Sequence, residues 1–290
     1  MTANRFDRQE LLFGAEGQAR LRAAKVAVVG AGGTGCFVIA QLALLGVGEI
    51  VSVDADQADI TTRNRHLCVR HGDPIPGTYK VEAAARMVRE FDPDIRFSPV
   101  PLSLMTPEGF EAVRSADYVF GCVDREGVRL VLAELCAAYA KPYIDVATGV
   151  EPGTPPRYGG TVCCSVSGVA CLVCTGELDV EEAVRDLENP DQQRDREAIY
   201  GIAASALGGR GPSVVSINGV VSSLAVTEFM KLCTGLDRPA PLLRYDGRAA
   251  RVSVRAESPK PDCYYCKAVW GSGRGADVER YLKPRRRIGQ

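Results

Sequence analysis

The chain has 290 residues, a length that suits one large α/β domain or two modest ones. Its 46% hydrophobic and 24% charged residues are typical of a soluble globular protein, and a net charge of −1 argues against nucleic acid or an anionic membrane as the main partner. No apolar run is long enough to cross a membrane and the polar N-terminus lacks the pattern of a signal peptide, so we expect a cytoplasmic protein.

Residues 1–24 are predicted to form a helical arm ahead of the first strand. The arm carries Arg5 and Arg8 about one helical turn apart. Surface arginines usually contact only water, so the arm by itself indicates no function.

The stretch 25–54 has the order strand, glycine turn, helix, strand and acid. A short apolar run at 26–29 is typical of a strand buried on both faces. After the glycines, an apolar segment at 37–45 is long enough for three helical turns, and a second strand at 49–53 ends at Asp54. This pattern predicts a nucleotide-binding βαβ unit.

The glycine turn between the first strand and the helix favours an anion. Glycine lets the backbone turn sharply and lets a phosphate approach without meeting a Cβ. The free N–H groups at the helix start, together with the helix dipole, then face the ligand. Asp54 is placed to accept hydrogen bonds from ribose hydroxyls. The glycines of this turn are Gly30, Gly32, Gly33 and Gly35.

Cationic side chains follow Asp54. The loop 55–66 lies at the carboxyl end of a strand, where open α/β sheets bind ligands, and its Arg63 and Arg65 have forked donors that suit phosphates. Lys80 begins a predicted helix, 79–91, at the end where the helix dipole disfavours a cation unless an anion is present. We interpret Lys80 as a further sign of a phosphate site.

Alternating strands and helices continue to residue 147, which predicts a Rossmann-like, doubly wound and mostly parallel sheet. Asp124 ends one of these strands beside the expected nucleotide crevice. A carboxylate near phosphate oxygens needs a hard cation between them, so Asp124 suits Mg²⁺; a helix N-cap is the alternative role. The strands are predicted at 95–100, 117–123 and 142–147, and the helices at 107–115 and 125–139.

Two cysteine pairs predict a structural zinc site. They are Cys171-x-x-Cys174 and Cys263-x-x-Cys266, with 88 residues between them, among eleven cysteines in the chain. Each pair supplies two thiolates and two pairs complete a closed tetrahedron, although two buried or disulfide-bonded pairs would have the same spacing. Such a metal would join the end of the chain to its middle.

The pattern changes beyond residue 150. An alternating stretch at 157–166 predicts an antiparallel strand, and 179–211 predicts a mobile segment that covers a site. A long helix is expected at 212–232, with Val215, Val220, Leu224, Val226 and Phe229 as its core residues, and a closing hairpin at 242–245 and 251–255. We divide the chain into the arm (1–24), a nucleotide-binding region (25–150), a zinc-stapled partner-binding and crossover region of the same domain (151–270) and a basic, flexible tail (271–290).

With these elements in place, the chain resembles the ThiF/MoeB/HesA adenylyltransferases, the bacterial form of the ubiquitin-activating superfamily. RFDRQ resembles the family's R-Y-x-R-Q arm, and VVGAGGTG its G-x-G-G-x-G turn. VDADQADITTRNRH is similar to D-x-D…N-L-x-R-Q, GTYKVEAA to G-x-x-K-V-E, and GCVDREGVR to C-x-D-N-x-x-x-R. With both cysteine pairs, the resemblance covers about residues 4–266.

The resemblance implies that ATP and Mg²⁺ activate the C-terminal glycine carboxylate of a ubiquitin-like or sulfur-carrier protein as an acyl-adenylate, releasing pyrophosphate. By position, it assigns ATP binding to the four glycines, Asp54, Asp56, Asn64, Arg65 and Lys80, and Mg²⁺ to Asp124. Arg8 becomes an arginine finger supplied by the second subunit of a homodimer. Together with Arg8, the catalytic set is then Arg65, Lys80 and Asp124.

The chain departs from the family pattern at three points. Thr62 and His66 stand where the motif has asparagine and glutamine, and the stretch 200–211 lacks the cysteine of thioester-forming relatives. We therefore expect adenylation without a thioester in that stretch, while the roles of Cys163, Cys164 and Cys233 stay open, with burial favoured over reactivity. A non-catalytic scaffold and an NAD-dependent oxidoreductase are the alternatives; the latter needs neither zinc knuckles nor an arginine arm.

Overall fold

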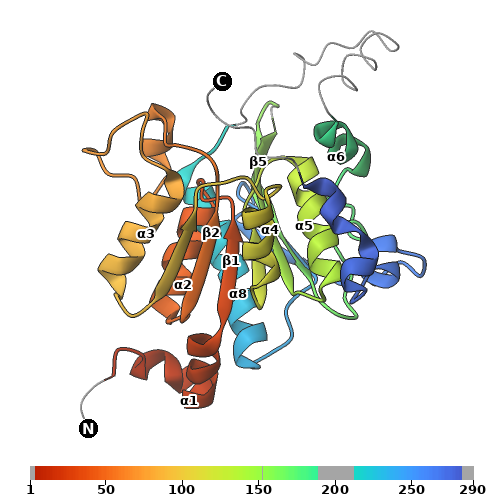
Figure 1. Cartoon of the computed structure of the whole chain (residues 1–290), viewed down its shortest axis with the longest axis horizontal. Helices are drawn as coiled ribbons and strands as arrows, with labels where there is room; N and C mark the ends of the chain where they lie inside the picture. The colour runs from red at the N-terminus through yellow and green to blue at the C-terminus, as the bar shows by residue number, and fades with distance from the viewer. Residues whose placement is uncertain (1–3, 152, 189–211, 283–290) are drawn as a thin grey trace.

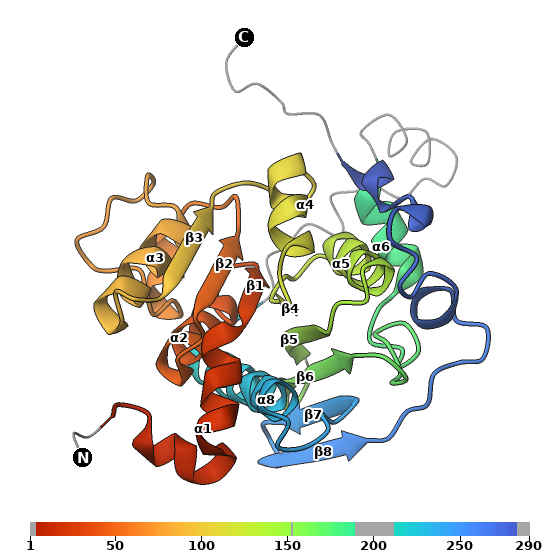
Figure 2. The ribbon, with the colours of Figure 1, turned by 60° about the horizontal axis from the view of Figure 1, so that its bottom comes forward.

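Eight strands form one sheet in the computed structural model, which describes residues 4–151, 153–188 and 212–282. The strand order is β3-β2-β1-β4-β5-β6-β7-β8, as Figure 2 shows. Pairing is parallel from β3 to β5 and antiparallel from β5 to β8. The predicted sheet with its antiparallel extension is therefore confirmed. The strands are β1 (Lys25–Val29), β2 (Glu49–Val53), β3 (Arg96–Val100), β4 (Tyr118–Gly121), β5 (Tyr143–Glu151), β6 (Arg157–Ser165), β7 (Leu242–Asp246) and β8 (Arg251–Arg255).

Helices cover both faces of this sheet (Figure 1). One face packs against α2 (Gly35–Leu45), α3 (Lys80–Phe91) and α8 (Val215–Thr234). The opposite face packs against α4 (Pro107–Arg114) and α5 (Glu126–Ala138). Strand β1 explains why both layers hold: Val26 and Val28 face the first layer and Ala27 and Val29 the second, all of them buried. A strand buried on both faces is typical of parallel sheets.

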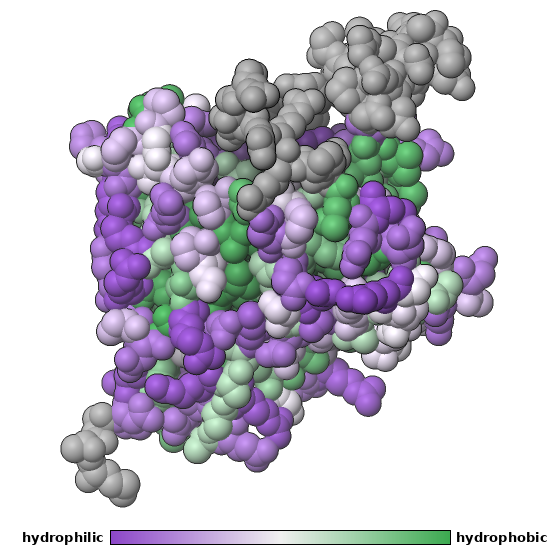
Figure 3. Space-filling model, viewed as in Figure 1, coloured by the Kyte–Doolittle hydropathy of each residue, from purple (hydrophilic) through white to green (hydrophobic). Residues whose placement is uncertain are grey.

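The N-terminal arm is a long helix, α1 (Asp7–Ala23), kinked at Gly14, whose φ is 72°. It lies at the amino ends of the strands, at the bottom of Figure 1, where the surface is largely hydrophilic (Figure 3). Gln9 and Gln18 donate hydrogen bonds to the carbonyl of Leu45, at the C-terminus of α2. Because α2 runs antiparallel to β1, this contact holds the arm at the edge opposite the glycine turn.

Two predicted flexible segments begin with ordered structure. Residues 180–187 form helix α6 (Val180–Leu187), capped by the Asp179 carboxylate, so a mobile segment from 179 was wrong for this part. Residues 271–282 form short helices η4 (Gly273–Ala276) and η5 (Val278–Tyr281) that pack on α5 with buried side chains, so a flexible tail was wrong here too. The rest of these two predictions, at 189–211 and 283–290, lies outside the described residues. Two further short helices are η1 (Ile60–Asn64) and η3 (Tyr264–Ala268), which begins directly after Cys263 and contains Cys266.

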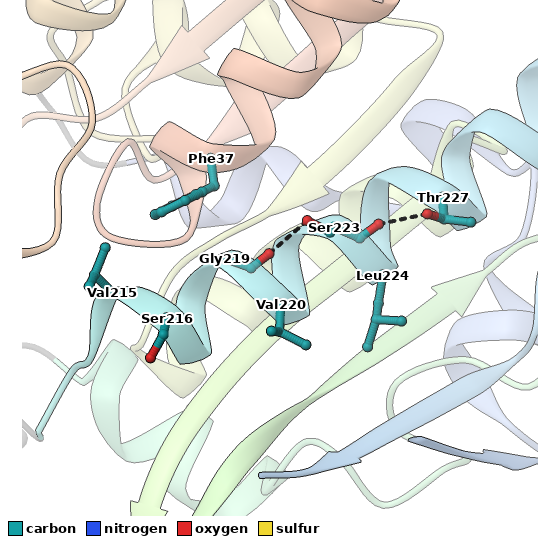
Figure 4. Close-up of a pocket in the computed structure, with 8 residues that line it drawn as sticks. All are labelled: Phe37, Val215, Ser216, Gly219, Val220, Ser223, Leu224 and Thr227. Atoms are coloured by element: carbon teal, nitrogen blue, oxygen red, sulfur yellow. Dashed lines mark hydrogen bonds between the residues drawn. The ribbon is translucent and has the colours of Figure 1, made fainter. Parts of the chain in front are cut away.

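Helix α8 buries part of the predicted core face: Leu224, Val226 and Phe229 pack on the core, and the two predicted valines nearer its N-terminus do not. Val226 and Phe229 are buried as expected, but Val215 and Val220 are 41% and 39% exposed. Figure 4 shows these two valines and Phe37 beside a hollow along α8. The hollow has a volume of about 520 Å³, and no titratable side chain in the described part of the chain lines it. The buried face includes Asn218, Ser222 and Glu228, polar residues that a count of apolar residues overlooks. No helix among the described residues is long and apolar enough to cross a membrane.

Candidate nucleotide-binding site and metal centre

A cleft of about 620 Å³ opens at the carboxyl ends of β1, β2, β4 and β5. Its lining contains the glycine turn and the predicted residues Asp54, Asp56, Arg65, Lys80 and Asp124. The predicted residues Gly35, Asn64 and Arg8 are not part of the lining. The strand order reverses between β1 and β4, and open α/β sheets bind ligands at such a switch point.

The four glycines of the turn have different reasons to be glycine. Gly30 has a φ of 88°, and a Cβ there would lie 2.4 Å from the carbonyl oxygen of Cys122. A Cβ on Gly35 would meet the carbonyl oxygen of Gly30 at 1.9 Å, and one on Gly33 would meet Asn218 Nδ2 at 2.5 Å. A Cβ on Gly32 would meet nothing within 4 Å. Three glycines are thus required by packing, whereas Gly32 borders open space.

The backbone N–H groups of Gly32, Gly33, Thr34 and Gly35 have no acceptor within the described part of the chain. Gly32, Gly33 and Thr34 precede α2, and Gly35 is its first residue. The first backbone hydrogen bond between the helix and this turn runs from Cys36 N to the Gly32 carbonyl. Unpaired N–H groups at the positive end of a helix dipole form a site for an anion such as phosphate. The turn therefore has the donors that a nucleotide needs.

Asp54 is tied to the turn. Its Oδ2 accepts a hydrogen bond from Ala31 N at 2.7 Å, and its Oδ1 accepts one from Asp56 N at 2.8 Å. Burial raises the pKa of the Asp54 carboxyl, and the charge of Lys80 opposes this rise. The carboxylate is held rigidly at the tip of β2, with lone pairs left for ribose hydroxyls.

Two cations line the cleft: Arg65, directly after η1, and Lys80, the first residue of α3. Lys80 Nζ lies 2.7 Å from Asp56 Oδ2, and the Lys80 side chain is only 15% exposed. Arg65 donates to the carbonyl of Thr61 at 2.5 Å and to Asn64 Oδ1 at 3.3 Å, and it forms no ion pair with any carboxylate in residues 4–151, 153–188 or 212–282. Its guanidinium charge is left for a ligand.

Asp124 is exposed and lines the cleft, and its carboxylate makes no hydrogen bond or ion pair with the described residues. Helix α5 starts two residues later with Arg125 as its N-cap residue, and no side chain caps it. The alternative role of Asp124 as a helix cap is therefore wrong. An exposed carboxylate without a partner, beside a phosphate-type site, fits a hard cation such as Mg²⁺.

The cleft also contains residues to which the sequence analysis gave no role, although Arg129 is the final arginine of the GCVDREGVR motif. Arg129 is 6% exposed, and its Nη2 and Nε lie 2.7 and 3.2 Å from the two carboxylate oxygens of Asp145, which is also buried. Asn218, 1% exposed, accepts from Thr148 Oγ1 at 3.1 Å and donates to Ser213 Oγ at 3.0 Å. A single amide inside an otherwise apolar helix was the available signal for Asn218.

Two departures from the family pattern have structural roles. Thr62 is buried and forms a capping box with Asp59 at the start of η1. His66 is buried with its Nε2 2.6 Å from the carbonyl oxygen of Ala31, and burial lowers its pKa to about 4. His66 is therefore a neutral imidazole behind the glycine turn, not part of the cleft lining.

Arg8 is exposed on α1, at the amino ends of the strands, so the structure does not bring it to the cleft of its own chain. The other predicted residues of the site line one cleft, except Gly35, which is buried at the start of α2, and Asn64, which is exposed on the neighbouring short helix.

The two predicted cysteine pairs meet. The sulfurs of Cys171, Cys174, Cys263 and Cys266 all lie within 4.8 Å of one another. Two of the Sγ–Sγ distances are 3.6 Å, far longer than the ~2.05 Å of a disulfide and close to the ~3.8 Å edge of a tetrahedron with ~2.3 Å zinc–sulfur bonds. Burial raises the pKa of Cys266 to about 12, so a cation is needed to keep such thiolates ionised together. The cluster can hold a zinc ion.

The three unassigned cysteines are buried. Burial raises the pKa of Cys163 to about 12 and that of Cys233 to about 11, and it raises the pKa of Cys164 well above its ordinary value. Buried thiols with a raised pKa are poor nucleophiles. The stretch 200–211, where a thioester cysteine is missing, lies outside the described residues.

The fold and the cleft define a Rossmann-like nucleotide-binding protein with a four-cysteine cluster in its antiparallel extension. Residues 6–265 match the ThiF family, and the chain belongs to that family. It is 28% identical over 268 residues to the molybdopterin-synthase adenylyltransferase of Escherichia coli K12. The alignment covers 90% of this chain and 95% of that protein.

Other relatives are longer than this chain. The adenylyltransferase and sulfurtransferase MOCS3-1 of Zea mays is 28% identical over 90% of this chain and 51% of its own length. The adenylyltransferase and sulfurtransferase uba4 of Pyricularia oryzae is 37% identical over 49% of this chain and 29% of its own length. The chain thus spans about half or less of these two relatives.

Solved structures share the fold. Escherichia coli MccB, crystallised with MccA-N7isoASN, superposes with a TM-score of 0.71 at 22% identity, over 91% of this chain and 75% of MccB. MccB crystallised with ATP gives a TM-score of 0.70 at 20% identity, over 91% of this chain and 75% of that one.

Proposed function

We propose that the chain is an ATP-dependent adenylyltransferase that activates the C-terminal glycine carboxylate of a ubiquitin-like or sulfur-carrier protein. A carboxylate oxygen of that glycine attacks the α-phosphorus of ATP, a new P–O bond forms, the bond to the β-phosphate bridge breaks, and pyrophosphate leaves. The observation that carries the proposal is one cleft that combines unpaired backbone N–H groups, two cations and a free carboxylate. The E. coli relative that it matches almost end to end is named for an adenylyltransferase.

In this proposal the cleft acts by positioning and charge neutralisation. The N–H groups of Gly32 and Gly33 bind phosphate oxygens, and Asp54 accepts from the ribose. Arg65, which has no carboxylate partner among the described residues, binds the triphosphate directly. Lys80 exchanges its contact with Asp56 for a phosphate when ATP enters.

Asp124 would hold Mg²⁺, since its exposed carboxylate has no partner in the described part of the chain. The ion would offset negative charge on the phosphates as pyrophosphate leaves. A zinc ion in the four-cysteine cluster would be structural, because four protein thiolates leave no open position. Cysteines stay reduced, and so available to bind zinc, in a reducing compartment such as the cytoplasm, the location that we expect.

Arg8 would act from a second copy of the chain. It lies on the far side of its own sheet from the cleft, so only another subunit can bring it to an ATP phosphate. A homodimer in which each arm reaches its partner's cleft would supply this charge. Isotope exchange between ATP and pyrophosphate, stimulated by the partner protein, depends on such a complete site.

ATP–pyrophosphate exchange tests the proposal. It is measured with and without ubiquitin-like proteins encoded near this gene, on the wild type, on Asp124→Ala and on Asp94→Ala. Asp94 is an exposed aspartate at the opposite edge of the sheet, so it is the matched control. Exchange that depends on the partner and on Asp124, but not on Asp94, is expected; ATP binding without exchange with any partner would favour the scaffold alternative.

A further inference from the structure

The two peptides that flank Ala31, inside the glycine turn, are each held by a side chain. Asp54 Oδ2 accepts from the Ala31 N–H at 2.7 Å, and His66 Nε2 lies 2.6 Å from the Ala31 carbonyl oxygen. His66 Nδ1 accepts from the N–H of Cys68 at 3.1 Å, which leaves the ring proton on Nε2. His66 therefore donates a hydrogen bond to the Ala31 carbonyl.

This bond determines where the next N–H group points. In a planar trans peptide, the C=O of one residue and the N–H of the next point in opposite directions. Because the Ala31 carbonyl is turned inward to buried His66, the N–H of Gly32 is turned away from the protein interior. Gly32 lines the cleft, and its N–H has no acceptor within the residues that the structure describes.

Glycine on one side of this peptide makes its orientation easy to lose. Gly32 tolerates backbone conformations that other residues avoid, so the peptide between Ala31 and Gly32 rotates at a lower cost if nothing holds it. Within the described residues, the Ala31 carbonyl has His66 as its hydrogen-bond donor. The imidazole is thus the described side chain that holds this peptide in one orientation.

We infer that His66 is a positioning residue for the nucleotide: it orients the Ala31–Gly32 peptide so that the Gly32 N–H donates to a phosphate of ATP. The inference rests on the proposed function, since it requires phosphate at this turn. It gives the one buried histidine of the loop a role in binding without contact between the ring and the ligand.

The test compares how two probes, ATP and adenosine, bind to the full chain and its variants. His66→Leu fills the site but removes the donor, and we expect its Kd for ATP to rise about tenfold, the loss of one hydrogen bond to a charged group. Its Kd for adenosine should stay within about twofold of the wild type, because adenosine has no phosphate for Gly32 to bind. His66→Gln keeps an N–H donor of similar reach and should restore ATP affinity.

His71→Leu, an exposed histidine on the same loop, is the matched control and should bind both probes like the wild type. Equal losses of ATP and adenosine binding in His66→Leu, or no rescue by His66→Gln, would mean a general packing role and overturn the inference. If His66→Leu does not fold, His66→Asn takes its place, because its shorter amide cannot reach Ala31; failure of that variant to fold also overturns the inference. If the wild type itself does not bind ATP, the proposed function fails first.

Discussion

The sulfur of Cys171 lies 3.6 Å from that of Cys263, although 92 residues of sequence separate them. This contact brings the loop after β6 next to the segment after β8, near the end of the described chain. Tyr264 and Arg280, on the same C-terminal segment, donate hydrogen bonds to Glu134 of α5. These bonds hold the C-terminal segment against α5. A metal at the cysteines would therefore stabilise contacts well beyond its four ligands.

Metal analysis should find one zinc per chain. Cys171→Ser should lose the zinc and lower the free energy of unfolding by several kcal/mol, a part of the ~10 kcal/mol that zinc binding can supply. Cys233→Ser, a buried cysteine outside the cluster, is the control and should keep its zinc. A wild type with well under one zinc per chain, from cells grown with zinc, would contradict the zinc site.

Replacing Lys80 should affect ATP use more than stability. In Lys80→Ala we expect kcat/KM for ATP to fall about 100-fold, since a preorganised charge on a phosphate is worth ~3 kcal/mol. Lys25 forms a comparable ion pair with Glu49, at 2.9 Å, at the opposite edge of the sheet. Lys25→Ala should retain wild-type kinetics; equal losses in both variants would show that Lys80 acts only through the fold.

Mixing two inactive variants tests the transfer of Arg8 between subunits. Arg8→Ala and Asp124→Ala should each lose pyrophosphate exchange as homodimers. A mixed dimer has one cleft with both defects and one cleft with neither, so re-association of the two variants should restore up to about a quarter of the wild-type exchange activity, by the statistics of random pairing. Activity that stays absent after verified subunit exchange would place Arg8 outside the catalytic set.

His66 should make the protein sensitive to acid. Burial lowers its pKa from 6.5 to about 4, and the charges of Lys80 and Arg65 add to this effect. The unfolded chain therefore binds a proton at a higher pH than the folded chain, so the contribution of His66 to stability is complete above pH 6.5 and is lost as pH falls to about 4. The loss amounts to about 3 kcal/mol.

Denaturant unfolding at several pH values checks this prediction. His66→Gln has no proton to gain, so the difference in unfolding free energy between wild type and variant should shrink or reverse as pH falls from 7 to 4. A difference that stays constant over that range would show that His66 is not buried as a neutral ring.

The parts of this structure that depend on local pattern could be predicted. The parallel strands, the glycine turn and the cleft residues Asp54, Lys80 and Asp124 all follow from apolar runs and from what stands at their carboxyl ends. What could not be predicted depends on tertiary packing. Nothing in the sequence neighbours of Asn218 on α8 or Arg129 on α5 shows that their partners are Thr148 and Asp145, which both lie on β5.

The exposed face of α8 and the ordered C-terminal segment also depend on tertiary packing. Val220 is as hydrophobic as buried Val221, and only the packing of α8 on the sheet decides which of them is covered. Ala276 and Val278 lie in a stretch rich in charge and glycine, yet α5 buries both. Likewise, the sequence shows His66 only as a departure from the family motif, and its contact with the Ala31 carbonyl of the turn comes from the structure.

The most direct test of the central claim follows one oxygen atom. The C-terminal carboxylate of the partner protein is labelled with oxygen-18, the partner is incubated with the enzyme and ATP, and the product is cleaved with hydroxylamine. If the carboxylate attacks the α-phosphorus, the AMP that is released carries one labelled oxygen. Unlabelled AMP, or ADP and phosphate in place of AMP and pyrophosphate, would contradict adenylation by this site.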